Sequence, residues 1–169
     1  DAFYKVVNSV SKGFIRTEAD EVQYNLHVLL RFDLERSLVS GDLQVKDLEA
    51  AWNDRFYSDF GYHVASASQG CLQDVHWSVG LFGYFPTYSL GNVYAGCLYD
   101  RLREHNTNLD DQLRVGNLNL ATDWLRDNVQ CHGALKTPSQ TISDACGFEP
   151  SEGPLLTYLQ RKFSDIYDL

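Results

Sequence analysis

The sequence predicts an all-α fold, and three observations support that prediction. Apolar side chains recur at spacings of three and four residues over most of the chain. Capping patterns and glycines separate these stretches, as they do at helix ends. Only residues 62–65 alternate in the manner of a strand. With 169 residues, of which 44% are hydrophobic and 13% aromatic, the chain can bury a sizeable core, and we expect a single helical region over residues 1–169.

The excess of acidic residues excludes some classes of binding partner. The chain has 23 acidic and 14 basic residues, a formal net charge of −9, which argues against binding to nucleic acid or to an anionic membrane surface. No apolar run is long enough to span a bilayer, and no secretion signal opens the chain. We therefore expect a cytoplasmic protein. Because it begins at Asp1 and contains no methionine, we also expect it to be trimmed from something longer.

The first predicted helix covers residues 17–40. Thr17 and Asp20 have the spacing of a capping box, with the shorter Asp20 in the position usually held by Glu. Acidic residues in this first turn suit the positive end of the helix dipole. Gly41 supplies the stop.

The two sides of this helix differ in polarity. The residues on its apolar side are Val22, Leu26, Leu29 and Leu30. The residues on its polar side, at steps of four, three and four, are Asp20, Tyr24, His27 and Arg31. This polar stripe fits a solvated face with i,i+4 pairs, such as Arg31 with Glu35. It fits equally a buried or cleft-facing network, because surface stripes rarely mix Tyr and His with charges.

Six further helices follow from the same apolar spacing. A helix over residues 47–60 would bury Leu48, Ala51, Trp52 and Phe56. Thr137 and Pro138 have the pattern of an N-cap and first residue of a short helix that Gly147 closes. The other predicted helices cover residues 87–105, 109–115, 118–131 and 154–167.

Residues 61–86 break the helical pattern. A long loop inside a compact helical domain is unusual unless it has a function. In this stretch and just beyond it, Gln73, Asp74, His76, Tyr84 and Tyr88 stand among glycines and large aromatic residues. Polar tips, a permissive backbone and apolar walls are what a ligand cleft needs. The alternative is a packed loop, with the aspartate capping a turn and the tyrosines filling the core.

The sequence offers no ligand set for a metal ion. The four cysteines lie at wide intervals, and no C-x-x-C, H-E-x-x-H or H-x₃₋₅-H pattern occurs. The tightest group is Cys131, His132 and Cys146, which lacks a fourth ligand and is explained as well by ordinary thiols. Neither a G-x-S-x-G motif nor a phosphate-binding loop is present. We therefore expect no metal or cofactor to be bound by this chain.

Arg16 stands directly before the first predicted helix. A guanidinium at that place could hold a carboxylate through two hydrogen bonds, with the positive helix end behind it. The alternative is an ordinary surface arginine.

Three blocks together give the chain a family resemblance. Residues 14–32 resemble the I-R-x-x-A-D block of the carboxypeptidase Taq family, and residues 70–77 match its G-x-x-Q-D-x-H-W block. Residues 83–92 resemble the segment that follows, and residues 124–167 are similar to the family's C-terminus. The blocks occur in the family's order and spacing, and the similarity spans essentially the whole chain.

The resemblance implies the last third of a zinc or cobalt metallocarboxypeptidase, which releases C-terminal residues from peptides. It implies a largely helical, saddle-shaped fold with a deep groove, a cytosolic homodimer, and peptide substrates. In that family the metal ligands lie upstream of the region that this chain covers. The isolated chain is then expected to be inactive without the missing N-terminal part of the same enzyme.

The resemblance also assigns roles to individual residues. Arg16 is the candidate for binding the substrate carboxylate or for supporting the pocket that binds it. His76 and Tyr84 are the candidates for hydrogen-bond donors to the tetrahedral intermediate, with Tyr88 as the competitor of Tyr84. The expected substrate-side shell is Gln73, Asp74 and Tyr88, with Asp74 fixing the tautomer of His76. The supporting residues are Asp20, His27 and Arg31.

A second function remains open from the residues alone. A helical module without catalysis, acting through protein–protein contacts, would have the same helical pattern and the same lack of metal ligands.

Overall fold

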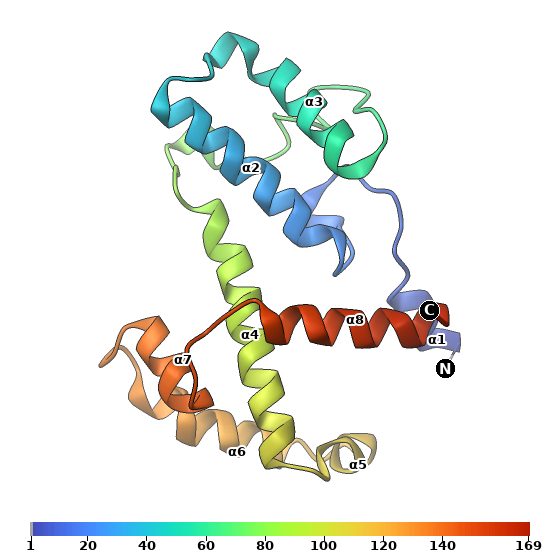
Figure 1. The fold of residues 1–169 in the computed structure, drawn as a ribbon, viewed down its shortest axis with the longest axis vertical. Helices are drawn as coiled ribbons and strands as arrows, with labels where there is room; N and C mark the ends of the chain where they lie inside the picture. The colour runs from blue at the N-terminus through green and yellow to red at the C-terminus, as the bar shows by residue number, and fades with distance from the viewer. Residues whose placement is uncertain (1) are drawn as a thin grey trace. The chain divides into compact units, whose positions relative to one another are not determined.

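The computed structural model describes residues 2–169, and the predicted all-α class is confirmed. Helices are the only regular structure in that range. Residues 62–65, which alternate in the manner of a strand, form none. The chain divides into two compact units, Asp1–Leu90 and Gly91–Leu169. Figure 1 shows the order of the helices along the chain. The prediction of a single region over residues 1–169 stays a prediction.

The core of the first unit lies between α2 and α3. The unit contains α1 (Ala2–Val7), α2 (Gln23–Ser40), α3 (Leu48–Phe60) and the start of α4 (Phe85–His105). Its short 3₁₀ helices are Arg16–Glu18, Val45–Asp47 and Trp77–Val79. The fully or almost fully buried side chains between α2 and α3 are Leu30, Leu34, Trp52 and Phe56. The α3 ring of Phe56 stacks on Phe60 at 4.4 Å between ring centroids, which continues this core toward Gly61.

The predicted start of the first long helix at Thr17 is wrong. Residues Arg16–Glu18 form a separate 3₁₀ turn, and α2 begins at Gln23. The carboxylate of Asp20 accepts hydrogen bonds from the backbone N–H groups of Val22 and Gln23, at 3.0 and 2.9 Å. Asp20 therefore caps this helix end itself, since it satisfies N–H groups that have no partner within the helix. The predicted stop at Gly41 is confirmed, with φ at +85°.

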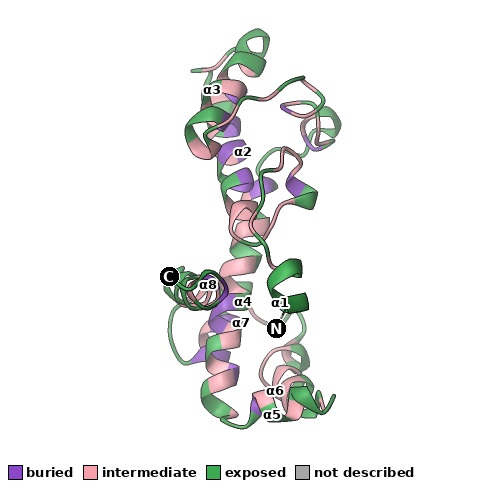
Figure 2. Cartoon of the chain, turned by 90° about the vertical axis from the view of Figure 1, so that its right-hand side faces the viewer, coloured by how far each residue is buried: buried purple, intermediate pink, exposed green. Residues whose placement is uncertain are grey.

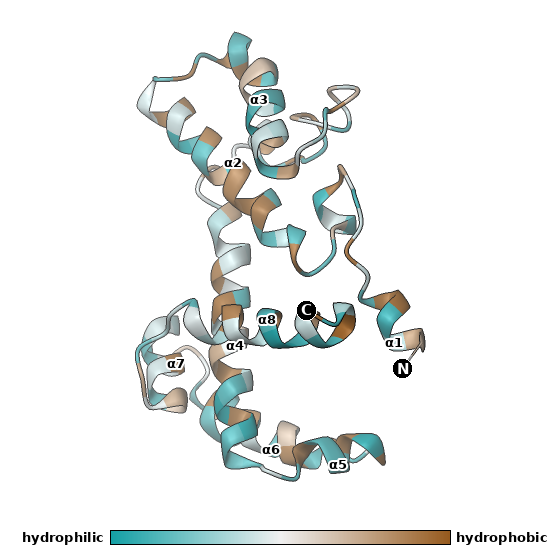
Figure 3. Cartoon of the chain, turned by 45° about the vertical axis from the view of Figure 1, so that its right-hand side comes forward, coloured by the Kyte–Doolittle hydropathy of each residue, from teal (hydrophilic) through white to brown (hydrophobic). Residues whose placement is uncertain are grey.

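The burial of α2 does not follow the predicted apolar side. Leu26 and Leu29 are 37% and 45% exposed, whereas His27 and Arg31 are fully buried beside Leu30. Hydrophobic and hydrophilic positions are mixed along this helix (Figure 3), and its buried positions are drawn in purple in Figure 2. Arg31 is buried because the loop after α3 supplies its carboxylate partner, Asp74, and the ring of His27 packs against Phe60. The solvated-face alternative is therefore wrong at these two positions.

The loop between α3 and α4 is held by side chains rather than by regular structure. The hydroxyl of Tyr62 both accepts from the N–H of Gly13, at 2.9 Å, and donates to its carbonyl, at 2.8 Å. Gly83, with φ at +78°, supplies a left-handed backbone at the entry to α4. The chain thus reaches α4 two residues before the predicted start at residue 87.

The second unit matches the predicted helices closely. It contains the rest of α4, α5 (Leu109–Arg114), α6 (Asn119–Asn128), α7 (Pro138–Cys146) and α8 (Gly153–Tyr167). The helix predicted over residues 118–131 is shorter: α6 ends at Asn128, and Gln130–His132 form a 3₁₀ turn. At α7 the predicted cap is confirmed, because the Thr137 side chain accepts from the N–H of Gln140.

The contacts of α4 with α7 and α8 form the core of this second unit. Cys97, Ile142 and Cys146 are buried together where α4 meets α7. Gly96 lies directly against α8, so close that a Cβ atom at this position would come within 2.8 Å of the backbone of Leu155. Only a residue without a side chain allows this approach.

Candidate functional site

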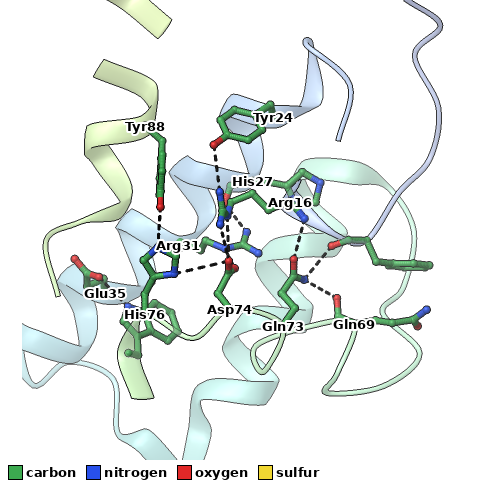
Figure 4. Close-up of polar contacts among 12 residues, drawn as sticks. Arg16, Tyr24, His27, Arg31, Glu35, Gln69, Gln73, Asp74, His76 and Tyr88 are labelled. Carbon is green, nitrogen blue, oxygen red and sulfur yellow. Dashed lines mark hydrogen bonds and ion pairs between the residues drawn. The ribbon is translucent and has the colours of Figure 1, made fainter. Parts of the chain in front are cut away.

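The candidate site is built around one carboxylate shared by two arginines (Figure 4). Arg16 donates from Nε and Nη2 to Oδ1 of Asp74, at 3.1 and 2.8 Å. Arg31 donates from Nε to the other oxygen, Oδ2, at 2.6 Å. All three groups lie in the first unit and are largely removed from solvent, with the side chain of Asp74 12% exposed. Asp74 therefore joins the loop to the 3₁₀ turn and to α2, instead of capping a turn.

Gln73 fixes the backbone around Arg16 against the loop. Its Oε1 accepts from the N–H of Arg16 at 2.9 Å. Its Nε2 donates to the carbonyls of Phe14 and Gln69, at 2.9 and 2.8 Å. The amide thus makes three hydrogen bonds to backbone, and these fix the 3₁₀ turn against residues 69–74.

Aromatic rings cover the faces of both guanidinium groups. The Cζ atom of Arg16 lies 4.8 Å from the ring centroid of Tyr88, and that of Arg31 lies 4.6 Å from Trp52. Tyr24 accepts a hydrogen bond from Nη1 of Arg16 at 3.2 Å. Cation–π contacts of this kind are stronger when the cation is desolvated. The rings and hydrogen bonds together leave Arg16 little freedom to change its orientation.

The electrostatics of the cluster leave a surplus of positive charge. Burial by itself would raise the pKa of Asp74, but the hydrogen bonds from Arg16 and the charge of Arg31 outweigh it and hold that pKa below its usual value. Burial lowers the pKa of Arg31 to about 10, against the opposing effect of Asp74, so Arg31 remains protonated at neutral pH. Two guanidinium cations therefore share one carboxylate, and no other carboxylate in the described range forms an ion pair with either of them.

His27 is a neutral neighbour of this cluster. Its side chain is fully buried, and neither ring nitrogen has a hydrogen-bond partner among the described residues. Its ring packs on Phe60, at 4.5 Å between centroids, and its backbone carbonyl accepts from Nη1 of Arg31 at 2.6 Å. Burial, together with the nearby charge of Arg31, lowers the pKa of His27 to about 4. His27 thus adds no charge to the site at neutral pH.

The other predicted residues gather beside the arginines. His76 is buried, and its Nε2 is 2.9 Å from the hydroxyl of Tyr88. Its Nδ1 lies 3.8 Å from Oδ1 of Asp74, which is too long for a hydrogen bond, so the expected fixing of the tautomer by Asp74 is not present. Tyr84 is 44% exposed, with its ring centroid 5.7 Å from that of His76. The ring of Phe85 fills the inner side of this group.

Glu35 is a site residue that the sequence reasoning did not identify. It is 4% exposed on α2, one turn beyond Arg31. Its Oε2 accepts from Nε1 of Trp77 at 2.8 Å, and its Oε1 accepts from the backbone N–H of Gly83. The sequence signal was its place at i+4 from Arg31, which suggested a local ion pair. The structure instead directs this carboxylate to the loop.

The described residues do not fit a catalytic metal ion. Between residues 2 and 169, no group of three or more His, Cys, Asp or Glu side chains is arranged to hold one, and Cys131, His132 and Cys146 form no such group. No chemical step is therefore assigned to a metal held by this chain. In the same range, no helix is both long and apolar enough to cross a membrane.

Comparison with known proteins agrees with the arrangement of these motifs. The family model of carboxypeptidase Taq (M32) metallopeptidases matches residues 1–163. Carboxypeptidase 1 of Bacillus subtilis is 38% identical over 99% of this chain and 33% of its own length. Thermostable carboxypeptidase 1 of Thermus thermophilus is 38% identical over 98% of this chain and 32% of its own. The chain spans about a third of the length of the curated relatives it matches.

Solved structures give the same result. The crystal structure of the M32 carboxypeptidase from Deinococcus radiodurans R1 superposes with a TM-score of 0.96 at 39% identity, over 99% of this chain and 34% of that one. Metallocarboxypeptidase 1 of Trypanosoma cruzi superposes with a TM-score of 0.91 at 36% identity, over 95% of this chain and 34% of that one. On the family match, the curated relatives and these structures, the chain belongs to the carboxypeptidase Taq (M32) family of metallopeptidases.

Proposed function

We propose that this chain forms the substrate-binding side of a metal-dependent carboxypeptidase that releases C-terminal amino acids from peptides. The observation that carries the proposal is the charge balance of the buried cluster. Arg16 and Arg31 share the single carboxylate of Asp74, so one of the two positive charges has no carboxylate partner of its own within residues 2–169. A desolvated, unbalanced cation is suited to an incoming anion, and the terminal carboxylate distinguishes the substrates of a carboxypeptidase.

Arg16 is the arginine that presents this charge to the substrate. Arg31 is fully buried, whereas Arg16 retains some exposure. Of the five N–H groups of a guanidinium, Arg16 uses Nε–H, one on Nη2 and one on Nη1 for its internal bonds. One N–H therefore remains on each terminal nitrogen. Two parallel hydrogen bonds from such a pair match the geometry of a carboxylate.

His76 and Tyr84 are proposed as hydrogen-bond donors to the oxyanion of the tetrahedral intermediate. His76 lies beside the Arg16 cluster with one nitrogen engaged by Tyr88, and the exposed ring of Tyr84 packs against it. A donor held in place before the reaction stabilises developing charge without reorganisation. Gln73 and Asp74 complete the substrate side by holding Arg16, while Asp20, His27 and Arg31 support it.

The remaining features of the complete enzyme are also proposals. The catalytic metal, zinc or cobalt, would be held by residues of the N-terminal part of the same enzyme, so residues 1–169 alone would be inactive. We place the complete enzyme in the cytoplasm, as a homodimer acting on peptides. The family's description as a metallopeptidase and the names of its carboxypeptidase relatives support the metal dependence and the peptide substrates.

The roles of His76 and Tyr84 are tested by steady-state kinetics of the complete enzyme. His76→Ala and Tyr84→Phe should each lower kcat by about 10²–10³-fold, with KM much less affected, because the interaction strengthens only in the transition state. Metal content is measured for each variant. If kcat were near the parental value in both variants, residues 70–88 would have a structural role and no catalytic one. The role of Arg16 is tested by the preference for free-acid over amide substrates.

A further inference from the structure

Glu35 holds both ends of a short segment of the loop. Its two carboxylate oxygens go to different partners, Nε1 of Trp77 and the backbone N–H of Gly83. Trp77 opens the 3₁₀ helix Trp77–Val79, and Gly83 ends the loop before α4. His76 directly precedes the first anchored residue, and Tyr84 directly follows the second.

The contacts of Glu35 differ from those of a surface acid. It is 4% exposed, and no lysine, arginine or histidine within residues 2–169 forms an ion pair with it. A buried carboxylate without a cation depends on hydrogen-bond donors, and each donor in turn loses its acceptor if the carboxylate is removed. Asp33, two residues earlier on the same helix, shows the contrast: its side chain is 43% exposed and pairs with Arg55.

We propose that Glu35 is a positioning residue, which fixes the spacing of His76 and Tyr84 by clamping the backbone between them. This inference rests on the proposed roles of those two residues. The carboxylate is fixed on α2, in the same helix that carries Arg31. Glu35 thereby places the two proposed oxyanion donors relative to the cluster that holds Arg16. A misplacement of about 1 Å in such a site can cost on the order of 10²-fold in rate.

The test uses Glu35→Gln in the complete enzyme. A glutamine keeps the shape of the side chain, but one of the two oxygens that face Trp77 and Gly83 becomes an NH₂ group, which donates where an acceptor is needed. We expect kcat to fall by about 10- to 100-fold with KM nearly unchanged. Amide hydrogen exchange in residues 77–84 should accelerate by about tenfold or more. The matched control is Asp33→Asn, which should change neither quantity.

A double-mutant cycle separates positioning from general damage. If Glu35 acts through His76 and Tyr84, then Glu35→Gln should cost less than about twofold when it is added to a variant that carries both His76→Ala and Tyr84→Phe. Unchanged exchange in residues 77–84, unchanged kcat, or full additivity in the cycle would each overturn the proposal. Failure of the proposed function is seen separately, as near-parental kcat in His76→Ala alone. In that case a fall in kcat on Glu35→Gln would also refute the claim that Glu35 acts through His76.

Discussion

Replacing Gly96 by alanine tests the packing of α4 against α8. The added Cβ would lie 2.8 Å from the Cα and N atoms of Leu155 and 2.9 Å from its Cβ. Two of these three atoms are backbone, so a rotation of the Leu155 side chain cannot relieve the clash. Overpacking of this kind costs about 1–3 kcal/mol, and the rigid neighbour places Gly96→Ala at the upper end. Against this, alanine gains about 1 kcal/mol in helix propensity.

The expected net result is a loss of about 2 kcal/mol in the free energy of unfolding. Urea unfolding followed by circular dichroism measures it, provided that the dependence on urea is the same in both proteins. Gly91→Ala is the matched control, since residue 91 lies in the same helix and a Cβ atom there would have nothing within 4 Å. This control should stabilise the protein by about 0.5–1 kcal/mol. Equal stabilisation by both substitutions would refute the close helix contact.

Two further predictions concern the buried polar cluster. As the pH falls from 6.5 to about 4, the unfolded chain binds a proton at His27 that the folded chain excludes, so stability should fall by about 3 kcal/mol. His27→Leu should remove most of this pH dependence, whereas His63→Leu, at an exposed position, should not. If the free energy of unfolding fell equally with pH in the parent and in both variants, the burial of a neutral His27 would be contradicted. Asp74→Asn should lower stability by about 3–5 kcal/mol, because it leaves two buried guanidinium groups without a carboxylate. Asp33→Asn should cost under about 1 kcal/mol, and equal losses in the two variants would argue against a buried ion pair at Asp74.

Local signals were enough to predict most of the helices. The short helix α7 is an example, because Thr137, Pro138 and Gly147 determine both of its ends within a few residues. The start of α2 was mispredicted for a related reason. Thr17 and Asp20 have the spacing of a cap, but only the structure shows that Asp20 receives the backbone N–H groups.

The burial of α2 depends on contacts that no local spacing contains. Asp74 pairs with Arg31, 43 residues earlier on α2, and with Arg16, 58 residues earlier, and the first of these contacts places a charged side chain on the inner side of the helix. Asp74 was singled out by the composition of its loop and Arg16 by its place before the first predicted helix, but neither signal predicts the contact between them. Glu35 was missed because its expected partner four residues earlier, Arg31, is paired with Asp74 instead.

The most direct test of the central claim measures how the complete enzyme distinguishes free-acid from amidated peptides. The ratio of kcat/KM for a peptide and for its C-terminal amide is compared in the parental enzyme, Arg16→Ala and Arg16→Lys. Charged hydrogen bonds contribute about 1.5–3 kcal/mol, so Arg16→Ala should reduce this ratio by about 10- to 100-fold. Arg16→Lys should recover it only in part, because lysine restores the charge without the paired N–H groups. Arg55→Ala, which removes a surface arginine, should leave the ratio unchanged. An undiminished acid-over-amide ratio in Arg16→Ala would contradict the assignment of Arg16 to the substrate carboxylate.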